Sequence, residues 1–343
     1  MLRIFEDLFK DLRKENISFC NWKGYGDLKN QLAGSGDLDI FVHLDDKKKF
    51  EEISKCRGFS HVVSYQANHS FLEHYYGFDS KSQKFAHMHV YFKIVTGEHI
   101  SKNYILPLDN YLMRNIDFNS LLPSLSENAK LNILLIRYFL KIGTLLGILQ
   151  YKSVEKKTSL DWNLIQIKQI KNGLPELGLS EKALNEMLRA YKNLSFFWKI
   201  YYSIMLKKKL RNYRRRSFLK NFIFTFKSIS LRILNKVFFK KKKLLNQGFV
   251  VAICGLDASG KSSLVNSLKN NFSRNFSVRT FHLGKPSSSL LTFMINPFVF
   301  LFRRLNRQLK NSNKSFKNSE AKYLSILNIL RALLLAYDRK KNS

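Results

Sequence analysis

Hydrophobic positions in the first 125 residues repeat with both helical and strand spacing. Apolar residues recur at helical intervals among acids and bases in residues 2–15, which predicts an amphipathic helix. The apolar run 17–22 predicts a short strand. Polar and apolar residues alternate in residues 37–42 and again in residues 85–99, and this period of two predicts two further strands. We therefore expect a small mixed sheet with helices in residues 1–125.

The later pattern predicts a helical region and then a second sheet. Ser126 opens the sequence SENAKL, which is typical of a helix N-cap, and this helix is expected to continue to residue 148. Two more helices are expected in residues 180–205, so residues 126–206 form a helical region. Residues 249–254 are apolar and predict a buried parallel strand, with a helix beginning near Lys261. The expected fold class is α/β, and residues 248–343 form its second domain.

Composition is that of an intracellular globular chain. Its 343 residues, 45% of them hydrophobic, are enough for two domains with ordinary cores. The three cysteines, Cys20, Cys56 and Cys254, lack the spacing of a disulfide framework or a metal site, which favours a reducing compartment. We therefore expect a cytoplasmic protein.

Charge is distributed unevenly along the chain. Residues 1–186 hold 25 Lys and Arg against 22 Asp and Glu, whereas residues 187–343 hold 34 against 3. Between Met187 and Leu256 there is no acidic residue. Because a basic excess of this size attracts anionic partners, residues 207–247 are expected to be a basic linker with a binding role.

An amphipathic helix is expected within this linker. Its apolar residues recur near helical spacing: Phe218, Leu219, Phe222, Ile223, Phe226, Ile229, Ile233, Val237 and Phe238. Cations fall between them: Lys220, Lys227, Arg232 and Lys236. The pattern fits a helix on an anionic membrane surface, which would place the protein at the inner face of the membrane. A solvated helix packed on protein and a nucleic-acid contact are the two alternatives.

The loop after the predicted strand matches the phosphate-binding pattern G-x-x-x-x-G-K-[ST]. The loop and the residue after it are Gly255, Leu256, Asp257, Ala258, Ser259, Gly260, Lys261, Ser262 and Ser263. Glycines allow backbone N–H groups to surround an anion, and the helix that follows directs its positive end toward the same anion. Lys261 is expected to reach the β- and γ-phosphates of ATP, and Ser262 to ligate Mg²⁺. The alternative is an ordinary Gly/Ser turn that binds nothing.

This loop resembles that of the thymidylate kinase branch of the nucleoside monophosphate kinases. The resemblance implies an acceptor-binding role for Asp257, which follows the first glycine by two residues. From Phe249 to Ser343 there are 95 residues, about half of what a five-stranded nucleotide kinase with its lid requires. We therefore expect an incomplete parallel-sheet kinase domain with weakened phosphotransfer.

Two carboxylates in the first domain suggest a second site. Asp37 and Asp39 alternate along one predicted strand, so both project from the same face. Like charges that close repel each other unless a cation lies between them, which favours Mg²⁺. With Lys23 and Gly24 upstream, the stretch resembles the polymerase-β-type nucleotidyltransferase superfamily, and Tyr25 stands where that family has a small residue. The resemblance implies that Asp37 and Asp39 hold the metal of a nucleotidyl-transfer site.

Histidines stand where the resemblance implies a third carboxylate. His87, His89 and Tyr91 occupy one face of the strand predicted for residues 85–99, and His69 and His74 lie nearby in the sequence. A His-x-His pair with an added carboxylate can bind a metal ion. The alternative is that His87 and His89 are ordinary hydrogen-bonding residues of a half-exposed strand.

As a whole, the chain resembles thymidylate kinase-like proteins of bacterial surface-polysaccharide gene sets. The resemblance implies a kinase-like protein that binds ATP and Mg²⁺ and acts in cell-surface glycan metabolism. Its phosphate acceptor is expected to be a nucleotide, a sugar or a lipid-linked glycan. Two alternatives remain: a nucleotidyltransferase that works through Asp37 and Asp39, and a membrane-surface adaptor without catalysis.

Overall fold

The structure is a computed structural model. It describes residues 1–63, 69–98, 100–149, 151–162, 169–193, 195–237, 243–244, 250–256, 258–273, 276–281, 300, 329, 333 and 336. The chain divides into two compact units. Unit 1 comprises Met1–Val251 with Asn275–Ser277, and unit 2 comprises Ala252–Arg274 with Val278–Ser343. The segments expected at 1–125, 126–206 and 207–247 therefore all fall in unit 1.

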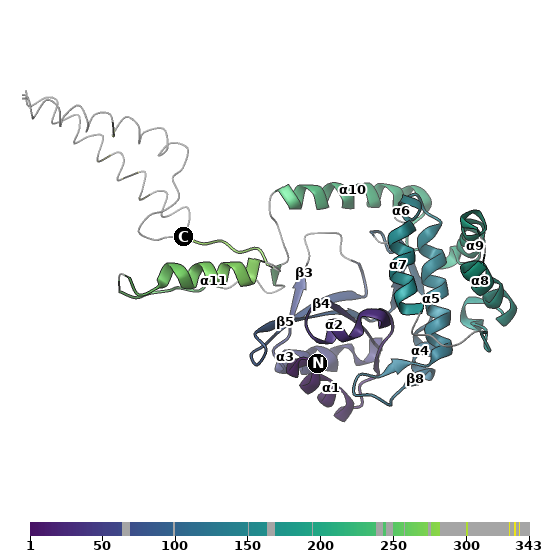
Figure 1. Ribbon diagram of the computed structural model, residues 1–343, viewed down its shortest axis with the longest axis horizontal. Coiled ribbons are helices and arrows are strands. Elements are labelled where there is room, and N and C mark those ends of the chain that lie inside the picture. Colours follow the sequence, from purple (N-terminus) through teal and green to yellow (C-terminus); the bar gives the residue numbers. More distant parts are fainter. Residues whose placement is uncertain are drawn as a thin grey trace, which may run out of the picture. The chain divides into compact units, whose positions relative to one another are not determined.

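Unit 1 is built on an eight-stranded mixed sheet with the strand order β10-β3-β4-β5-β2-β1-β9-β8 (Figure 1). Its strands are β1 (Phe19–Asn21), β2 (Asp37–Val42), β3 (Ser60–Val63), β4 (Leu72–Asp79), β5 (Lys84–Tyr91), β8 (Ile116–Asp117), β9 (Ser124–Leu125) and β10 (Lys243–Leu244). β2 is parallel to β5 and β1 is parallel to β9, whereas the other neighbours are antiparallel. A separate antiparallel pair consists of β6 (Ile94–Thr96) and β7 (Tyr104–Leu106). The predicted α/β class is confirmed.

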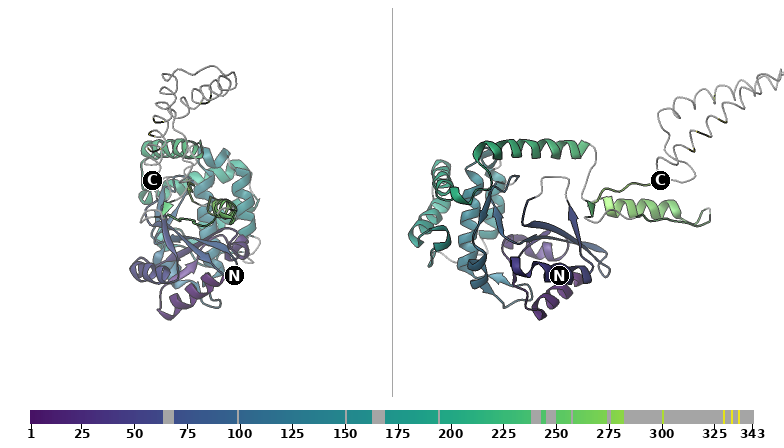
Figure 2. Two further views of the ribbon diagram at one scale, coloured as in Figure 1. Left: turned by 90° about the vertical axis from the view of Figure 1, so that its left-hand side faces the viewer. Right: turned by 180° about the vertical axis from the view of Figure 1, so that it is seen from behind.

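The helices of unit 1 cover both faces of this sheet. They are α1 (Arg3–Lys14), α2 (Leu28–Leu32), α3 (Lys47–Cys56), α4 (Asp109–Arg114), α5 (Glu127–Ile142), α6 (Leu145–Leu149), α7 (Tyr151–Trp162), α8 (Glu181–Asn193), α9 (Phe196–Lys209) and α10 (Phe218–Val237). Single 3₁₀ turns are η1 (Tyr25–Asp27), η2 (Leu44–Asp46), η3 (Pro175–Leu177) and η4 (Arg211–Tyr213). Helix α5 packs against α7, α8 and α9, and Figure 2 shows this group from two further directions.

One core lies between α1 and the sheet. Phe5, Leu8, Phe9 and Leu12 recur at intervals of three and four in α1, and all four are fully buried. They pack with sheet residues that include Leu38 of β2. Burying one such side chain contributes about 1.5–3 kcal/mol, so the α1 stripe is a major source of stability for this face. The helix predicted for residues 2–15 is confirmed.

The opposite face of β2 carries the polar residues. Leu38 and Ile40 are fully buried in the α1 core. Asp37 and Asp39 alternate with them along the strand, and therefore project from the other face of the sheet. The same alternation that builds the core thus places both carboxylates on the side away from α1.

The helical region begins where the sequence predicts. Ser126 precedes α5 with non-helical backbone angles, and its carbonyl accepts a hydrogen bond from Lys130 N, although its side chain makes no capping bond. α5 ends at Ile142, earlier than expected, and Gly143 follows as its C-cap. A Cβ at Gly143 would lie only 2.0 Å from Ser203 Oγ of α9, so close packing of two helices requires glycine there. The two helices expected in residues 180–205 are α8 and α9.

The strand expected at the start of the second domain does not form. Residues 250–254 are irregular, and Val250 and Val251 are exposed. A parallel strand is stable only when neighbouring strands satisfy its backbone and cover its side chains. In the described part of unit 2 the regular element is α11 (Lys261–Ser273), and no strand is present there.

Among the described residues, no helix combines the length and the apolar character that crossing a membrane requires.

Candidate functional site

Three neighbouring strands bring two carboxylates and three imidazoles onto one face of the sheet. In the parallel pair β2–β5, Asp37 is opposite His87 and Asp39 is opposite His89. In the antiparallel pair β4–β5, His74 is opposite His89. Residues directly opposite each other on neighbouring strands project to the same face, so all five side chains share one surface.

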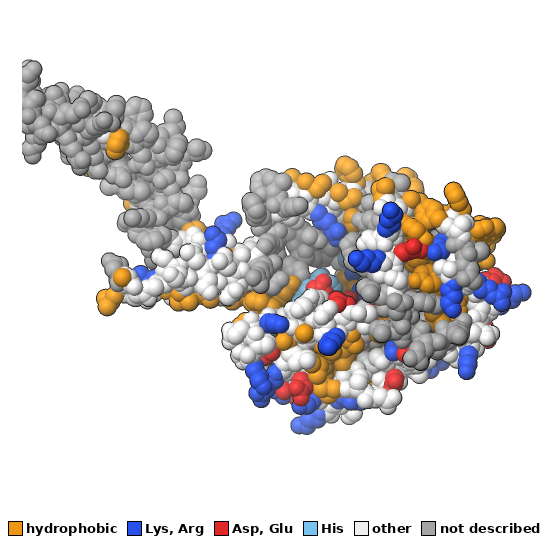
Figure 3. Space-filling model, in the orientation of Figure 1, with side chains coloured by type: hydrophobic (Ala, Val, Ile, Leu, Met, Phe, Trp, Pro, Cys, Tyr) orange, Lys and Arg blue, Asp and Glu red, His pale blue; other side chains and the backbone are white. Residues whose placement is uncertain are grey.

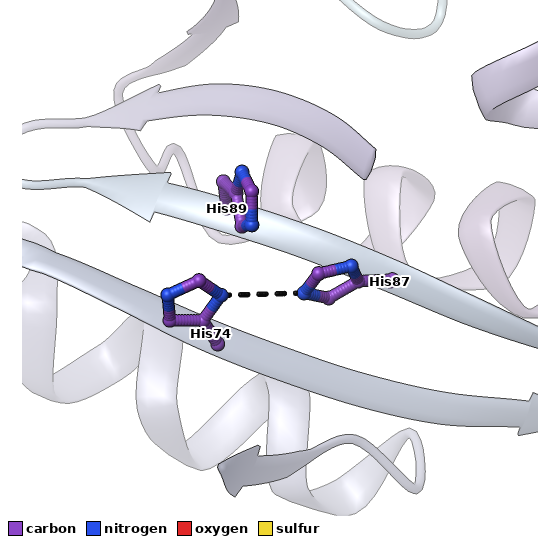
Figure 4. Close-up of side chains that lie close together, drawn as sticks. All are labelled: His74, His87 and His89. Atoms are coloured by element: carbon purple, nitrogen blue, oxygen red, sulfur yellow. Dashed lines mark hydrogen bonds between the residues drawn. The ribbon is translucent and has the colours of Figure 1, made fainter. Parts of the chain in front are cut away.

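The three imidazoles form a compact cluster (Figure 4). His74 Nδ1 lies 3.3 Å from His87 Nε2, and the ring of His89 stands nearly perpendicular to both neighbouring rings. One ring nitrogen from each histidine lies within 4.8 Å of the other two. Three converging imidazole nitrogens are a donor set that suits a divalent transition-metal ion.

The two carboxylates contact the imidazoles from β2. Asp37 Oδ1 is hydrogen-bonded to His87 Nδ1, and Asp37 Oδ2 lies 3.6 Å from His89 Nε2. The other nitrogen of His89, Nδ1, lies 3.4 Å from Asp39 Oδ1. The side chain of Asp37 is 52% exposed and that of Asp39 is 14% exposed. Asp37 is therefore the carboxylate within reach of a ligand arriving from solvent.

Asp39 forms a largely buried ion pair with Lys23. Lys23 Nζ lies 2.8 Å from Asp39 Oδ1, and Lys23 also donates a hydrogen bond of 2.9 Å to the Tyr91 hydroxyl. Burial alone would raise the pKa of Asp39, but the Lys23 ammonium and the His89 imidazole lower it below its usual value. Asp39 is thus ionised at neutral pH. The cation beside Asp39 in the structure is the ammonium of Lys23, and His89 lies between the two carboxylates.

Gly24 forms the turn that carries Lys23 to the site. Its φ of +76° lies in the left-handed region, and a Cβ there would lie 2.9 Å from Gln31 Nε2. The following turn is η1, whose Gly26 N donates a hydrogen bond of 2.8 Å to Asp161 Oδ1 of α7. Tyr25 lies in the same turn with its ring 5.2 Å from Lys130 Nζ. The turn is thus held against the helical region.

A group of cations adjoins the carboxylates. Lys102 Nζ donates a hydrogen bond of 3.1 Å to the Tyr91 hydroxyl, the same oxygen that Lys23 contacts. Burial, reinforced by the nearby Lys23, lowers the pKa of Lys102 to about 7. Histidine and acidic side chains are visible together in a hollow of the surface in Figure 3.

Arginines extend this group of cations. Arg215 donates a hydrogen bond of 3.1 Å to Ser70 Oγ, and Arg216 lies over the ring of Phe224 at 3.6 Å. Burial lowers the pKa of the neighbouring His69 to about 3. The positive charges of Lys102, Arg215, Arg216 and Arg232 contribute to the same lowering. Arg215 Nη1, Arg216 Nη1 and Arg232 Nε are buried without a hydrogen-bond partner in the described part of the chain. We call Lys102, Arg215, Arg216 and Arg232 the basic cluster; it suits a polyanionic ligand.

The loop of unit 2 that is predicted to bind phosphate precedes a helix, as expected. Helix α11 begins at Lys261, and Ser262 and Ser263 occupy its first turn. Gly260 has a φ of +80°, and Lys261 Nζ donates hydrogen bonds to the carbonyl of Gly255, at 2.8 Å, and to that of Leu256. Ala258 also has a positive φ, of 65°, and Ser259 N contacts Leu256 O at 3.3 Å. Asp257 lies outside the described residues.

Two parts of the unit 1 site were not fully predicted. His74 was noted near the candidate site, but the strand β4 that carries it was not predicted, although Leu72, His74 and Tyr76 recur at every second position, as residues on one face of a strand do. The basic cluster joins residues more than one hundred positions apart, so no local pattern indicates it. Its signal in the sequence is limited to the excess of basic residues after position 186.

No family model matches the chain, and neither a curated protein nor a solved structure shows a significant match to it.

Proposed function

We propose that unit 1 is a metal-dependent domain of nucleotidyltransferase type, which transfers a nucleotidyl group from a nucleoside triphosphate to an acceptor hydroxyl. The observation that carries this proposal is the convergence of Asp37, Asp39 and His89 on one face of the sheet, beside the Lys23 ammonium. Carboxylate and imidazole groups together suit a divalent ion, and a nearby cation balances the charge of a phosphate oxygen.

The basic cluster supports a substrate with several phosphates. Lys102 is joined to the carboxylate site through Tyr91, and the guanidinium groups of Arg215 and Arg216 include buried N–H groups that have no partner among the described residues. Unpaired buried cations are unfavourable until an anion joins them, because burial removes their hydration. The planar guanidinium group of arginine matches phosphate oxygens both in the geometry of its N–H donors and in charge. This arrangement favours a triphosphate over a neutral substrate.

In the proposed reaction, the oxygen of the acceptor hydroxyl bonds to the α-phosphorus of the triphosphate. The bond from that phosphorus to the oxygen bridging the β-phosphate breaks, and pyrophosphate leaves with the bonding electron pair. Asp37, the more exposed carboxylate, accepts the proton of the hydroxyl, and Lys102 and Arg215 bind the departing pyrophosphate. A metal ion held at the site would supply further charge stabilisation at the α-phosphate.

Binding of triphosphate analogues tests this function. We would titrate α,β-methylene analogues of the common nucleotides into the full chain with Mn²⁺. The chain would carry Lys261→Ala, which removes the lysine proposed to bind phosphate in the loop of unit 2. At least one analogue is expected to bind, and Asp37→Asn to weaken it at least about tenfold. Asp45→Asn is the matched control, because this carboxylate is 86% exposed and lies outside the site. Failure of every analogue to bind, or equal affinity in the Asp37 and Asp45 variants, would overturn the proposal.

A second function is supported by unit 2: binding of ATP with Mg²⁺ by a kinase-like phosphotransfer domain. The start of α11 at Lys261 and the left-handed turn at Gly260 support it, because together they direct backbone N–H groups toward an anion. Lys261 would pair with the phosphates and Ser262 with Mg²⁺. The acceptor proposed for either unit is a nucleotide, a sugar or a lipid-linked glycan of the cell surface, on the basis of the resemblance in sequence.

A further inference from the structure

The separation of His74 and His87 has the value that a shared metal ion requires. Ligands on a tetrahedral ion with metal–nitrogen bonds of about 2.0–2.1 Å are about 3.3–3.4 Å apart. His74 Nδ1 and His87 Nε2 lie 3.3 Å apart, and a ring nitrogen of His89 completes a set within 4.8 Å. The three donors come from β4 and β5, so the backbone hydrogen bonds of the sheet hold their spacing.

A carboxylate contacts the nitrogen of His87 that faces away from His74, and carboxylates lie near both nitrogens of His89. Asp37 is hydrogen-bonded to His87 Nδ1, which leaves His87 Nε2 directed toward His74. His89 lies between Asp37 and Asp39. A carboxylate behind an imidazole fixes the ring orientation and increases its basicity as a metal ligand. Asp37 would therefore act on the metal largely through His87.

The donor set distinguishes between metals. Mg²⁺ requires oxygen ligands in near-octahedral geometry, whereas imidazole nitrogen suits Zn²⁺ and its transition-metal neighbours. We infer that His74, His87 and His89 bind one transition-metal ion of the Zn²⁺ type. The fourth coordination position of this ion is left for an oxygen of the substrate. The inference rests on the proposed function for its catalytic role. The metal affinity itself is measured without substrate, so the two can fail separately.

Metal titration of the full chain tests this site. We would remove bound metal with a chelator and then titrate Zn²⁺, and separately Co²⁺, whose visible spectrum reports tetrahedral coordination. One ion is expected to bind, with Mg²⁺ in large excess unable to displace it, and His74→Ala is expected to weaken binding at least about tenfold. His43→Ala is the matched control, because His43 lies outside the cluster.

Three results would overturn the metal site: no Zn²⁺ binding by the wild-type chain, displacement of Zn²⁺ by Mg²⁺ at comparable concentration, or equal affinity in the His74 and His43 variants. The wild-type titration requires no substitution, so misfolding of a variant cannot conceal the answer. If Zn²⁺ fails to bind, the contact between His74 and His87 is an ordinary hydrogen bond between two imidazole rings.

A different observation concerns helix α10, which turns its apolar side outward. Phe218, Phe222 and Phe226 follow one another at four-residue spacing and are all exposed, with Leu219 and Ile223 beside them. Hydrophobic side chains follow α10 along the upper edge of the view in Figure 3. An amphipathic helix normally buries this side, so its exposure indicates a partner surface.

The other side of α10 faces the rest of unit 1 and carries polar residues together with Phe224. Ser228 is buried, and Asn221 Nδ2 contacts Glu98 Oε2 at 3.5 Å. Arg216, just before the helix, lies over the ring of Phe224. These contacts fix the rotation of the helix about its axis and keep the phenylalanines outside.

Charge identifies the occupant of this surface. Lys220 and Lys227 are exposed beside the phenylalanines, and no acidic residue occurs between Met187 and Leu256. Aromatic side chains combined with lysines, without acids, match the boundary between the acyl chains and the headgroups of an anionic bilayer. We infer that α10 lies on an anionic membrane surface, with its phenylalanines inserted between headgroups.

Vesicle binding tests this surface. The full chain is expected to bind vesicles of phosphatidylcholine mixed with phosphatidylglycerol, to release them as NaCl rises, and to bind pure phosphatidylcholine weakly. The double variant Phe222→Asp, Phe226→Asp is expected to lose binding, whereas Phe118→Asp, at an exposed position outside α10, retains it. Equal binding to neutral vesicles, unchanged binding of the double variant, or binding of duplex DNA in place of vesicles would overturn the inference.

Discussion

Lys23 Nζ lies 2.8 Å from Asp39 Oδ1, and both side chains are about 85% removed from solvent. This pair joins the Gly24 turn to β2 at the centre of the candidate site. Burial lowers the pKa of Lys23, an effect that the Asp39 carboxylate opposes and the Arg137 guanidinium reinforces. Asp39 consequently has a structural role as well as a position in the site, whereas Asp37 is open to solvent.

The first prediction concerns the stability of this pair. Asp39→Asn leaves the Lys23 ammonium buried without its partner, and should lower the free energy of unfolding by about 3–5 kcal/mol. Urea denaturation of the full chain measures the loss. Adding Lys23→Met should recover part of it, and Asp45→Asn should stay within about 0.5 kcal/mol of wild type. A loss no larger for Asp39→Asn than for Asp45→Asn would contradict the role given to the pair.

The second prediction concerns the loop of unit 2. Lys261→Ala should weaken the binding of ATP with Mg²⁺ at least about tenfold, because it removes the ammonium that pairs with the β- and γ-phosphates. Calorimetry in an Asp37→Asn background isolates this site from unit 1. Lys269→Ala, which changes an exposed lysine of the same helix, should leave affinity unchanged. Equal affinity of the two lysine variants would exclude a nucleotide-binding loop.

The third prediction follows from the basic cluster. Burial lowers the pKa of Lys102 to about 7 in the folded chain, against about 10.4 when unfolded. Lys23, Arg137 and Arg232 reinforce this lowering, and Asp39 opposes it. Between pH 7 and 10 the unfolded chain therefore binds more protons at this position. Stability contributed by Lys102 should rise with pH over that interval, by at most about 1.4 kcal/mol per pH unit.

The variant Lys102→Met tests whether stability rises with pH because of Lys102. It keeps most of the aliphatic stem and removes the titrating ammonium. The stability of the variant should therefore lack the increase between pH 7 and 10, while all other groups titrate as before. Urea denaturation at pH 7, 8 and 9 compares the two chains. Parallel stability curves for wild type and Lys102→Met would show that the ammonium is not held away from solvent.

Elements with a regular apolar pattern were predicted correctly from the sequence. α1 and β2 are identified by the spacing of their buried residues, and β5 by the alternation through His87 and His89. β4 was missed because His74 and Tyr76 replace apolar residues on the face that carries the site. Residues that build a site on a strand therefore weaken the pattern that identifies the strand.

Contacts between distant segments could not be predicted in this way. The approach of the Lys23-Gly24 turn to Asp39 was expected from a resemblance of motifs, although the ion pair was not. The approach of Arg215 and Arg232 to His69 depends on the path of the chain from η4 through α10 over the rest of unit 1. The strand expected at residues 249–254, of which 250–254 are described, illustrates the opposite error. Apolar composition alone predicted it, but a strand also requires a neighbour, which the described part of unit 2 does not contain.

Anomalous diffraction tests the central claim most directly, namely that unit 1 holds a metal ion for a phosphorylated substrate. Crystals of the full chain would be grown with Zn²⁺ and an α,β-methylene triphosphate. We expect an anomalous peak bonded to the ring nitrogens of His74, His87 and His89. We also expect phosphate density between that peak and Lys102. Imidazoles without a metal peak, or a triphosphate found at Lys261 and absent from unit 1, would contradict this claim.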